Sequence, residues 1–172
     1  NAGWPCYHTK LYDFEYRNGK YGIIPYVVGS SFAVLVAEEL FVAGCKLLIL
    51  LTSSGKLSEH RNNKDFFIIE KAIRDEGTSN HYLPSEAYSA INENILIKLE
   101  GNDALTAAAN FGISWTTDAP FRETNQGIDG ALSFGAAIVE MEAAALYAFG
   151  KAKNRQIVCV AQITNQMGQK VG

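Results

Sequence analysis

Short, almost wholly apolar runs alternate with segments of helical periodicity along most of this chain. Residues 46–51 and 157–163 are runs of this kind, and they are typical of strands buried on both faces. Each follows a stretch in which apolar residues recur every three or four positions. This alternation predicts an α/β fold, in which a largely parallel or mixed sheet is covered by helices.

The first part of the chain predicts a β-hairpin followed by a helix. Residues 11–16 and 21–28 predict its strands, and the turn between them contains Asn-Gly, which tolerates the positive φ angles of a tight hairpin. Residues 31–44 have helical spacing. We expect Ser31 to cap the start of this helix and Gly44 to end it.

The rest of the chain shows no repeat, low-complexity tract or linker, so residues 1–172 are predicted to form a single domain. Residues 85–110 predict two helices that are broken near Gly101. The remaining predicted elements are strands at residues 65–73, 113–117 and 157–163 and an alanine-rich helix at residues 140–150.

Composition and charge exclude several classes of function. Of the 172 residues 48% are apolar, and the formal net charge is −3, so neither a disordered chain nor a basic surface for nucleic acid is indicated. The apolar runs are too short to cross a bilayer. Cys6, Cys45 and Cys159 are an odd number at wide spacing, which favours buried thiols in a reducing compartment. We therefore expect a cytoplasmic protein with no membrane segment and no metal centre.

Ligands of such sheets bind beyond the carboxyl ends of the strands. In the first segment that this rule selects, Thr52, Ser53 and Ser54 offer hydroxyl groups and main-chain amides that can bind an oxyanion. An ordinary polar turn has the same composition, so the composition alone does not decide between the two. The four selected segments are residues 52–55, 74–81, 116–124 and 164–166.

Two other segments contain side chains suited to acid–base work and ring recognition. His81 can act as a donor or as an acid or base near neutral pH, or it can be a structural residue. Phe121 can stack on a flat ring while Arg122 donates two hydrogen bonds to it. The alternative is that Arg122 pairs at the surface with a neighbouring carboxylate, Asp118 or Glu123.

Glu140, Met141 and Glu142 stand where an apolar stretch enters the alanine-rich helix. Acidic side chains favour the positive end of a helix dipole, so one interpretation is simple capping. In the other, a carboxylate accepts hydrogen bonds from two vicinal sugar hydroxyls beside the apolar wall of Met141. Successive helical residues do not share a face, so the two acids have different roles. The residues alone leave both interpretations open.

Taken together and in order, these segments resemble the nucleoside phosphorylase family, which includes uridine phosphorylase and the hexameric bacterial purine nucleoside phosphorylases. The most specific runs are Val-Glu-Met-Glu-Ala-Ala-Ala-Leu and Ile-Arg-Asp-Glu-Gly-Thr-Ser, and the resemblance covers residues 18–166. The matching stretches are residues 29–31, 37–40, 52–55, 73–81, 116–124 and 139–146.

The resemblance implies a barrel-like mixed sheet flanked by helices, here truncated at both ends relative to the family. It also implies phosphorolytic cleavage of a nucleoside to free base and ribose 1-phosphate, without a metal or organic cofactor and with phosphate as co-substrate. The expected partners are therefore a nucleoside, phosphate and further copies of the chain in a dimer or hexamer, with no nucleic acid and no membrane.

The family's site residues match particular positions of this sequence. By this resemblance, Glu142 holds the ribose hydroxyls and Glu140 and Met141 line the sugar site. The implied phosphate-binding residues are Thr52, Ser53 and Ser54; the implied base-binding residues are Phe121, Arg122 and Gln126; the implied catalytic residues are Asn165 and Arg122, with His81 as a further candidate.

Asn165 bears on the choice of base. The purine-specific hexameric members carry an aspartate at the matching position, which protonates the departing purine. An amide cannot donate a proton in that way, although it can hydrogen-bond. Uridine phosphorylases resemble this chain in having asparagine, so the resemblance favours a pyrimidine nucleoside.

The chain also departs from the family at the phosphate site. Leu50 stands where the family has a phosphate-binding arginine, and Thr52 replaces the usual glycine. Arginine is the residue that normally pairs with phosphate through two hydrogen bonds. The sequence therefore leaves two alternatives to phosphorolysis, namely a nucleosidase that uses water and a catalytically weak nucleoside-binding paralogue.

Overall fold

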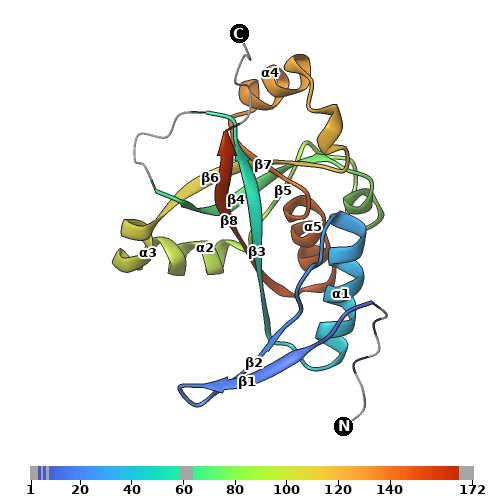
Figure 1. Ribbon diagram of the computed structural model, residues 1–172, viewed down its shortest axis with the longest axis vertical. Helices are drawn as coiled ribbons and strands as arrows, with labels where there is room; N and C mark the ends of the chain where they lie inside the picture. Colours follow the sequence, from blue (N-terminus) through green and yellow to red (C-terminus); the bar gives the residue numbers. More distant parts are fainter. Residues whose placement is uncertain (1–3, 5, 7, 59–63, 167–172) are drawn as a thin grey trace.

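The main sheet closes on itself. The computed structural model describes residues 4, 6, 8–58 and 64–166 (Figure 1). Its six strands follow the spatial order β5-β4-β6-β7-β3-β8, and a further pairing of β4 with β8 closes five of them into a barrel-like ring. The predicted α/β fold with a mixed, barrel-like sheet is confirmed. The strands are β3 Leu47–Lys56, β4 Phe66–Asp75, β5 Tyr88–Ala90, β6 Ala109–Thr117, β7 Ala136–Glu140 and β8 Gln156–Gln166.

Strand direction divides the ring into two groups. β4, β6 and β7 are parallel to one another, whereas β3 and β8 are parallel to each other and run antiparallel to β7 and β4 respectively. The carboxyl ends of the two groups therefore face opposite ways. The prediction that residues 52–55 form a loop beyond the end of a strand is wrong, because this segment lies within β3.

One face of β3 is uncovered, so the prediction that residues 46–51 are buried on both faces is wrong. Leu47, Ile49 and Leu51 are 48%, 58% and 77% exposed, whereas Leu48 and Leu50 pack against the core. This is the alternation of a strand that packs one of its two faces against the core. The outward face borders an apolar groove of about 470 Å³, which is also lined by residues of α2 and α3. In β8, by contrast, Ile157, Val158 and Cys159 are all buried.

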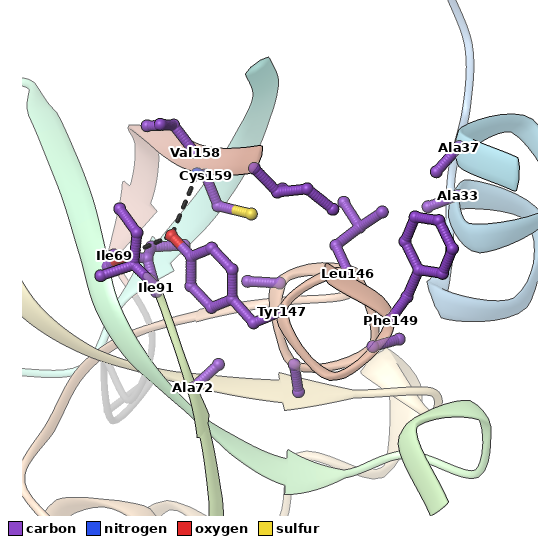
Figure 2. Close-up of a cluster of buried hydrophobic side chains, with 14 of the residues drawn as sticks. Ala33, Ala37, Ile69, Ala72, Ile91, Leu146, Tyr147, Phe149, Val158 and Cys159 are labelled. Carbon is purple, nitrogen blue, oxygen red and sulfur yellow. Dashed lines mark hydrogen bonds between the residues drawn. The ribbon is translucent and has the colours of Figure 1, made fainter. Parts of the chain in front are cut away.

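The core lies between the sheet and two helices, α1 (Ser30–Val42) and α5 (Ala143–Lys153). Figure 2 shows Phe149 of α5 directed toward Ala33 and Ala37 of α1, and Tyr147 directed toward the strands. The Tyr147 hydroxyl donates to the main-chain carbonyl of Ile69 and accepts from the N–H of Cys159 at 3.0 Å. The helix is thereby tied to β4 and β8.

The other helices lie around the ring. The predicted break near Gly101 is confirmed, since Asn102 caps the second helix of that pair through its side chain. Within the described ranges, no helix is long and apolar enough to cross a membrane. The helices other than α1 and α5 are η1 Thr78–His81, α2 Glu93–Glu100, α3 Asp103–Ala108, η2 Pro120–Arg122 and α4 Asn125–Ser133.

The predicted hairpin and helix near the amino terminus are present, but the bounds of the hairpin strands differ from the prediction. The hairpin comprises β1 (Tyr12–Tyr16) and β2 (Gly19–Ile23), but its positive-φ turn residues are Arg17 and Asn18 rather than Asn-Gly. Its second strand ends five residues before the predicted bound. In α1, Gly44 adopts a φ of 103° just after the helix, as predicted.

Candidate functional site

The carboxylate of Glu142 lies where three distant segments meet. Its Oε1 accepts a hydrogen bond from the main-chain N–H of Gly29 at 2.7 Å. Its Oε2 accepts one from the hydroxyl of Thr52 at 2.9 Å. The side chain is only 3% exposed, so both oxygens are held within the fold. Each oxygen can still accept one further hydrogen bond.

The strand register explains why these segments meet. β3 runs antiparallel to β7, with Gly55 opposite Val139, so the middle of β3 lies beside the residues that follow β7. The chain also begins α1 here: the hydroxyl of buried Ser30 donates to the carbonyl of Met141 at 2.8 Å. The predicted cap Ser31 is therefore wrong, because α1 starts at Ser30 after Gly29. A carboxylate at this helix start is favoured by the helix dipole.

Glu140 has a different environment from Glu142. Its Oε2 accepts hydrogen bonds from the main-chain N–H groups of Glu142 and Ala143 at 2.8 and 2.7 Å. Burial raises the pKa of the Glu140 carboxyl to about 7, although these hydrogen bonds act in the opposite direction. The predicted helix at residues 140–150 is wrong at its start, because Glu140 ends β7 and the helix begins at Ala143. Glu140 thus satisfies the first N–H groups of α5.

Two buried hydroxyls on β6 complete the contacts of Glu140. Its Oε1 accepts hydrogen bonds from Ser114, at 3.0 Å, and from Thr116. Thr116 also accepts from the N–H of Ala144 at 3.0 Å. Ser114 and Thr116 were not predicted as partners of Glu140 from the sequence. The available signal was their spacing of two residues on a predicted strand, which places both side chains on one face.

The predicted phosphate-binding residues lie on β3 and face different surroundings. The hydroxyl of buried Ser54 donates to the carbonyl of Gln162 at 3.2 Å, whereas Ser53 is exposed. A hollow of about 230 Å³ is lined by Thr52 and Ser53 together with Phe66 and Gln162, among others. The hydroxyls of this segment therefore have three different environments: that of Thr52 donates to Glu142, that of Ser54 donates to β8, and Ser53 is exposed.

The predicted base-binding residues belong to η2 and α4, whereas Glu140 ends β7 and Glu142 precedes α5. Phe121 is fully exposed and, like Arg122, belongs to η2, while Gln126 is exposed on α4. In the part of the chain that the structure describes, these three side chains make no hydrogen bond to Glu140 or Glu142.

Asn165 lies near the end of β8, with its Cα paired to that of Gly55 on β3. Its Oδ1 accepts a hydrogen bond from the hydroxyl of Thr164 at 3.2 Å. Since Thr52 is paired with Ala161, Asn165 lies further along the same two strands, roughly 10 Å from Thr52 at the usual strand rise.

The polar segment around His81 is organised by Arg74 at the end of β4. Its guanidinium donates to Ser79 Oγ at 2.8 Å, to the carbonyl of Pro84 at 2.6 Å and to Asn80 Oδ1 at 2.9 Å. These bonds fold η1 and the loop that follows it. His81 is exposed at the end of η1, so the segment forms a structured loop around an arginine.

Leu50 is half-buried and packs against the core cluster on the face of β3 that also carries Thr52. It supplies an apolar wall at the position that the resemblance matches to a phosphate-binding arginine. Within the described residues, no three or more His, Cys, Asp and Glu side chains are grouped so as to hold a metal ion.

The structure is similar in fold to several solved structures. Uridine phosphorylase from Vibrio fischeri, in complex with 6-hydroxy-1-naphthoic acid, matches 95% of this chain and 68% of its own with a TM-score of 0.81 and 21% identity. A mutant of Helicobacter pylori MTAN with 5′-methylthioadenosine in its active site matches 94% of this chain and 74% of its own, with a TM-score of 0.76 and 16% identity.

The sequence is also similar to that of an archaeal uridine phosphorylase. It is 29% identical over 182 residues to uridine phosphorylase from Thermococcus kodakarensis, a match that covers 90% of this chain. The chain spans 65% of the length of that relative. A family profile described as the phosphorylase superfamily matches residues 3–172. Because this match takes in nearly the whole sequence, the chain belongs to the phosphorylase superfamily.

Proposed function

We propose that this protein is a nucleoside phosphorylase that cleaves the N-glycosidic bond of a pyrimidine nucleoside, releasing free base and ribose 1-phosphate. The observation that carries the proposal is the carboxylate of Glu142. It is buried, held by one donor on each oxygen, and keeps one acceptor position on each. Two vicinal hydroxyls of a ribose fit this acceptor pair.

The reaction needs a stabilised sugar cation between two anionic groups. An oxygen of phosphate forms a bond to C1′ while the bond from C1′ to the base nitrogen breaks, and the bonding electrons leave with the base. In this proposal Glu142 binds the ribose hydroxyls, Met141 and Glu140 border the sugar, and Ser53 and Ser54 bind phosphate with Thr52. Binding that is stronger in the transition state than in the ground state accelerates the reaction.

The base is assigned to the segment after β6 and to Asn165. Phe121 stacks on the ring, and Arg122 and Gln126 donate hydrogen bonds to its polar edge. Asn165 hydrogen-bonds the departing base without protonating it, which suits a pyrimidine better than a purine. In this proposal the nucleoside spans the two groups of residues, with its sugar at Glu142 and its base at η2 and α4. His81 remains a candidate donor on the neighbouring loop.

Hydrolysis is a second candidate, and the apolar surroundings of Leu50 favour it. A phosphate dianion beside a half-buried leucine lacks the guanidinium that normally pairs with it. Water needs no such partner. In the hydrolytic alternative the same carboxylate holds the sugar and water attacks C1′, giving free ribose and base.

Release of free base from uridine, thymidine, inosine and adenosine, measured with and without phosphate, separates the candidates. The proposal expects turnover of uridine only when phosphate is present, with ribose 1-phosphate as product. Turnover that does not depend on phosphate would replace phosphorolysis by hydrolysis. Saturable nucleoside binding without turnover under either condition would identify a binding paralogue.

The variant Glu142→Gln tests the residue that carries the proposal. An amide preserves the shape but presents only one acceptor oxygen, so uridine turnover should fall by about a hundredfold or more. Glu86→Gln is the matched control, because Glu86 is an exposed glutamate in the segment between η1 and β5. Equal activity of Glu142→Gln and the control would contradict the assignment of the sugar site.

The proposal includes a cytoplasmic location and assembly of the chain into a dimer or hexamer. It includes phosphate as co-substrate and no cofactor. Sedimentation of the purified protein, with and without phosphate and uridine, measures the assembly directly. A monomer under all these conditions would contradict the oligomeric part and leave the chemistry to be judged by the turnover assays.

A further inference from the structure

Among the described residues, the hydroxyl of Thr52 is the one side-chain group that hydrogen-bonds the carboxylate of Glu142. A hydroxyl has one proton to donate. Its two acceptors here are Glu142 Oε2 at 2.9 Å and the carbonyl of Ser53 at 3.3 Å, and the shorter bond to a charged oxygen is the stronger one. Thr52 thus faces the proposed sugar-binding carboxylate.

We propose that Thr52 is a positioning residue for Glu142, and that through it the site distinguishes a ribose from a 2-deoxyribose. This inference rests on the proposed function, in which Glu142 binds the sugar. It moves Thr52 from phosphate binding to sugar recognition and leaves phosphate to Ser53 and Ser54.

The geometry explains how one hydroxyl could have this effect. The main-chain N–H of Gly29 holds Oε1 at 2.7 Å, and Thr52 holds Oε2. With both oxygens held, the plane of the carboxylate is fixed, and so are the directions of its two remaining acceptor positions. A ribose can then use both positions together, whereas a 2-deoxyribose lacks one of the two hydroxyls. A carboxylate held at one oxygen only can turn, and it gains less from the second hydroxyl.

The placement of Thr52 suits a positioning role. It lies in the middle of β3, where its Cα is paired with that of Ala161 on β8. Donors on a paired strand are held more rigidly than donors on a loop. Two residues further along β3, the hydroxyl of Ser54 donates to the carbonyl of Gln162 on β8 and not to Glu142.

The test compares uridine with 2′-deoxyuridine in saturating phosphate. Thr52→Val keeps the shape of the side chain and removes the hydroxyl, whereas Thr52→Ser keeps the hydroxyl. For Thr52→Val we expect KM for uridine to rise about tenfold, the value of one hydrogen bond to a charged group, and KM for 2′-deoxyuridine to change much less. Thr52→Ser should restore the KM values of the unsubstituted protein for both substrates. Thr106→Val, which loses a hydroxyl bonded within α3, is the control.

A purely structural role for Thr52 predicts a different pattern. Loss of folded protein lowers the apparent kcat for both substrates equally and leaves their KM ratio unchanged, and that outcome would overturn the proposal. Equal KM increases for the two substrates, or no rescue by Thr52→Ser, would overturn it as well.

A double-mutant cycle tests the contact without using activity. The shifts in urea midpoint for Thr52→Val and Glu142→Gln should be non-additive in the double variant, because both remove the same hydrogen bond. Additive shifts would show that Thr52 does not hold the carboxylate. If the unsubstituted protein neither cleaves nor binds a nucleoside, the proposed function fails, and sugar discrimination by Thr52 fails with it. The cycle still decides whether the contact positions Glu142.

Discussion

Glu140 holds the main chain of Glu142: a carboxylate oxygen of Glu140 accepts the N–H of Glu142 at 2.8 Å. The two acids are therefore coupled, yet they act differently. The Glu140 carboxylate binds four protein donors from β6 and from the start of α5, whereas that of Glu142 binds two donors, one from Gly29 just before α1 and one from Thr52 on β3. Glu140 is the better suited to support the local fold, and Glu142 the better suited to bind a ligand.

Stability should depend on pH through Glu140. Burial raises its pKa in the folded protein to about 7, from an ordinary value of 4.5. The folded state then binds more protons than the unfolded state between these values. The stabilisation is complete below pH 4.5, falls as pH rises and is lost above pH 7, a change on the order of 3 kcal/mol.

Urea unfolding of the unsubstituted protein and of Glu140→Gln at pH 5 and pH 7.5 measures this contribution. The glutamine cannot titrate, so the midpoint of the variant should change less between the two pH values. Glu86→Gln should follow the unsubstituted protein. Identical pH dependence in all three proteins would assign the effect to other groups.

Removal of the Thr116 hydroxyl should destabilise the start of α5. This hydroxyl donates to Glu140 and accepts from the N–H of Ala144, and Thr116 is completely buried. Thr116→Val should lower the free energy of unfolding by about 2–3 kcal/mol, because both partners remain buried without it. Thr116→Ser should recover most of the loss. Chemical denaturation measures the difference, and equal stability of the valine and serine variants would contradict it.

Tyr147→Phe should be destabilising although the ring stays in place. The hydroxyl ties α5 to the main chain of Ile69 and Cys159 (Figure 2). Its loss leaves two buried main-chain groups without this partner, at a cost of about 1–3 kcal/mol. Tyr88→Phe is the control, since the hydroxyl of Tyr88 bonds the carbonyl of Phe134 in an exposed position. If Tyr147→Phe lowers the free energy of unfolding no more than the control does, the hydrogen bonds of the Tyr147 hydroxyl contribute little to stability.

Arg74→Lys should loosen the loop that carries His81. Lysine cannot reproduce the planar fork by which Arg74 binds Ser79, Asn80 and the carbonyl of Pro84. Amide hydrogen exchange in residues 79–83 should become about tenfold faster, while global stability changes little. Arg155→Lys, at a ring contact with Phe41, serves as the control. Unchanged exchange in the loop would mean that other contacts hold it.

Much of the fold follows from local pattern in the sequence. The apolar runs and helical spacing predict the α/β class, and the break at Gly101 and the end of α1 at Gly44 follow from single residues with known backbone preferences. Glu140 and Glu142 do have different surroundings, but the helical spacing from which this was predicted is wrong, because Glu140 ends β7 and Glu142 precedes α5. That residues 1–172 form one domain stays a prediction.

Tertiary structure alone decided which side chains meet. Residues 52–55 have the composition of a polar turn, yet pairing with β8 draws them into β3. Antiparallel alignment with β7 then brings Thr52 to Glu142, 90 positions away. The same pairing decides that Leu48 and Leu50 face the core while Leu47 and Ile49 do not. Strand direction and register depend on contacts between segments distant in sequence. The local pattern of one strand does not specify which other strand it pairs with.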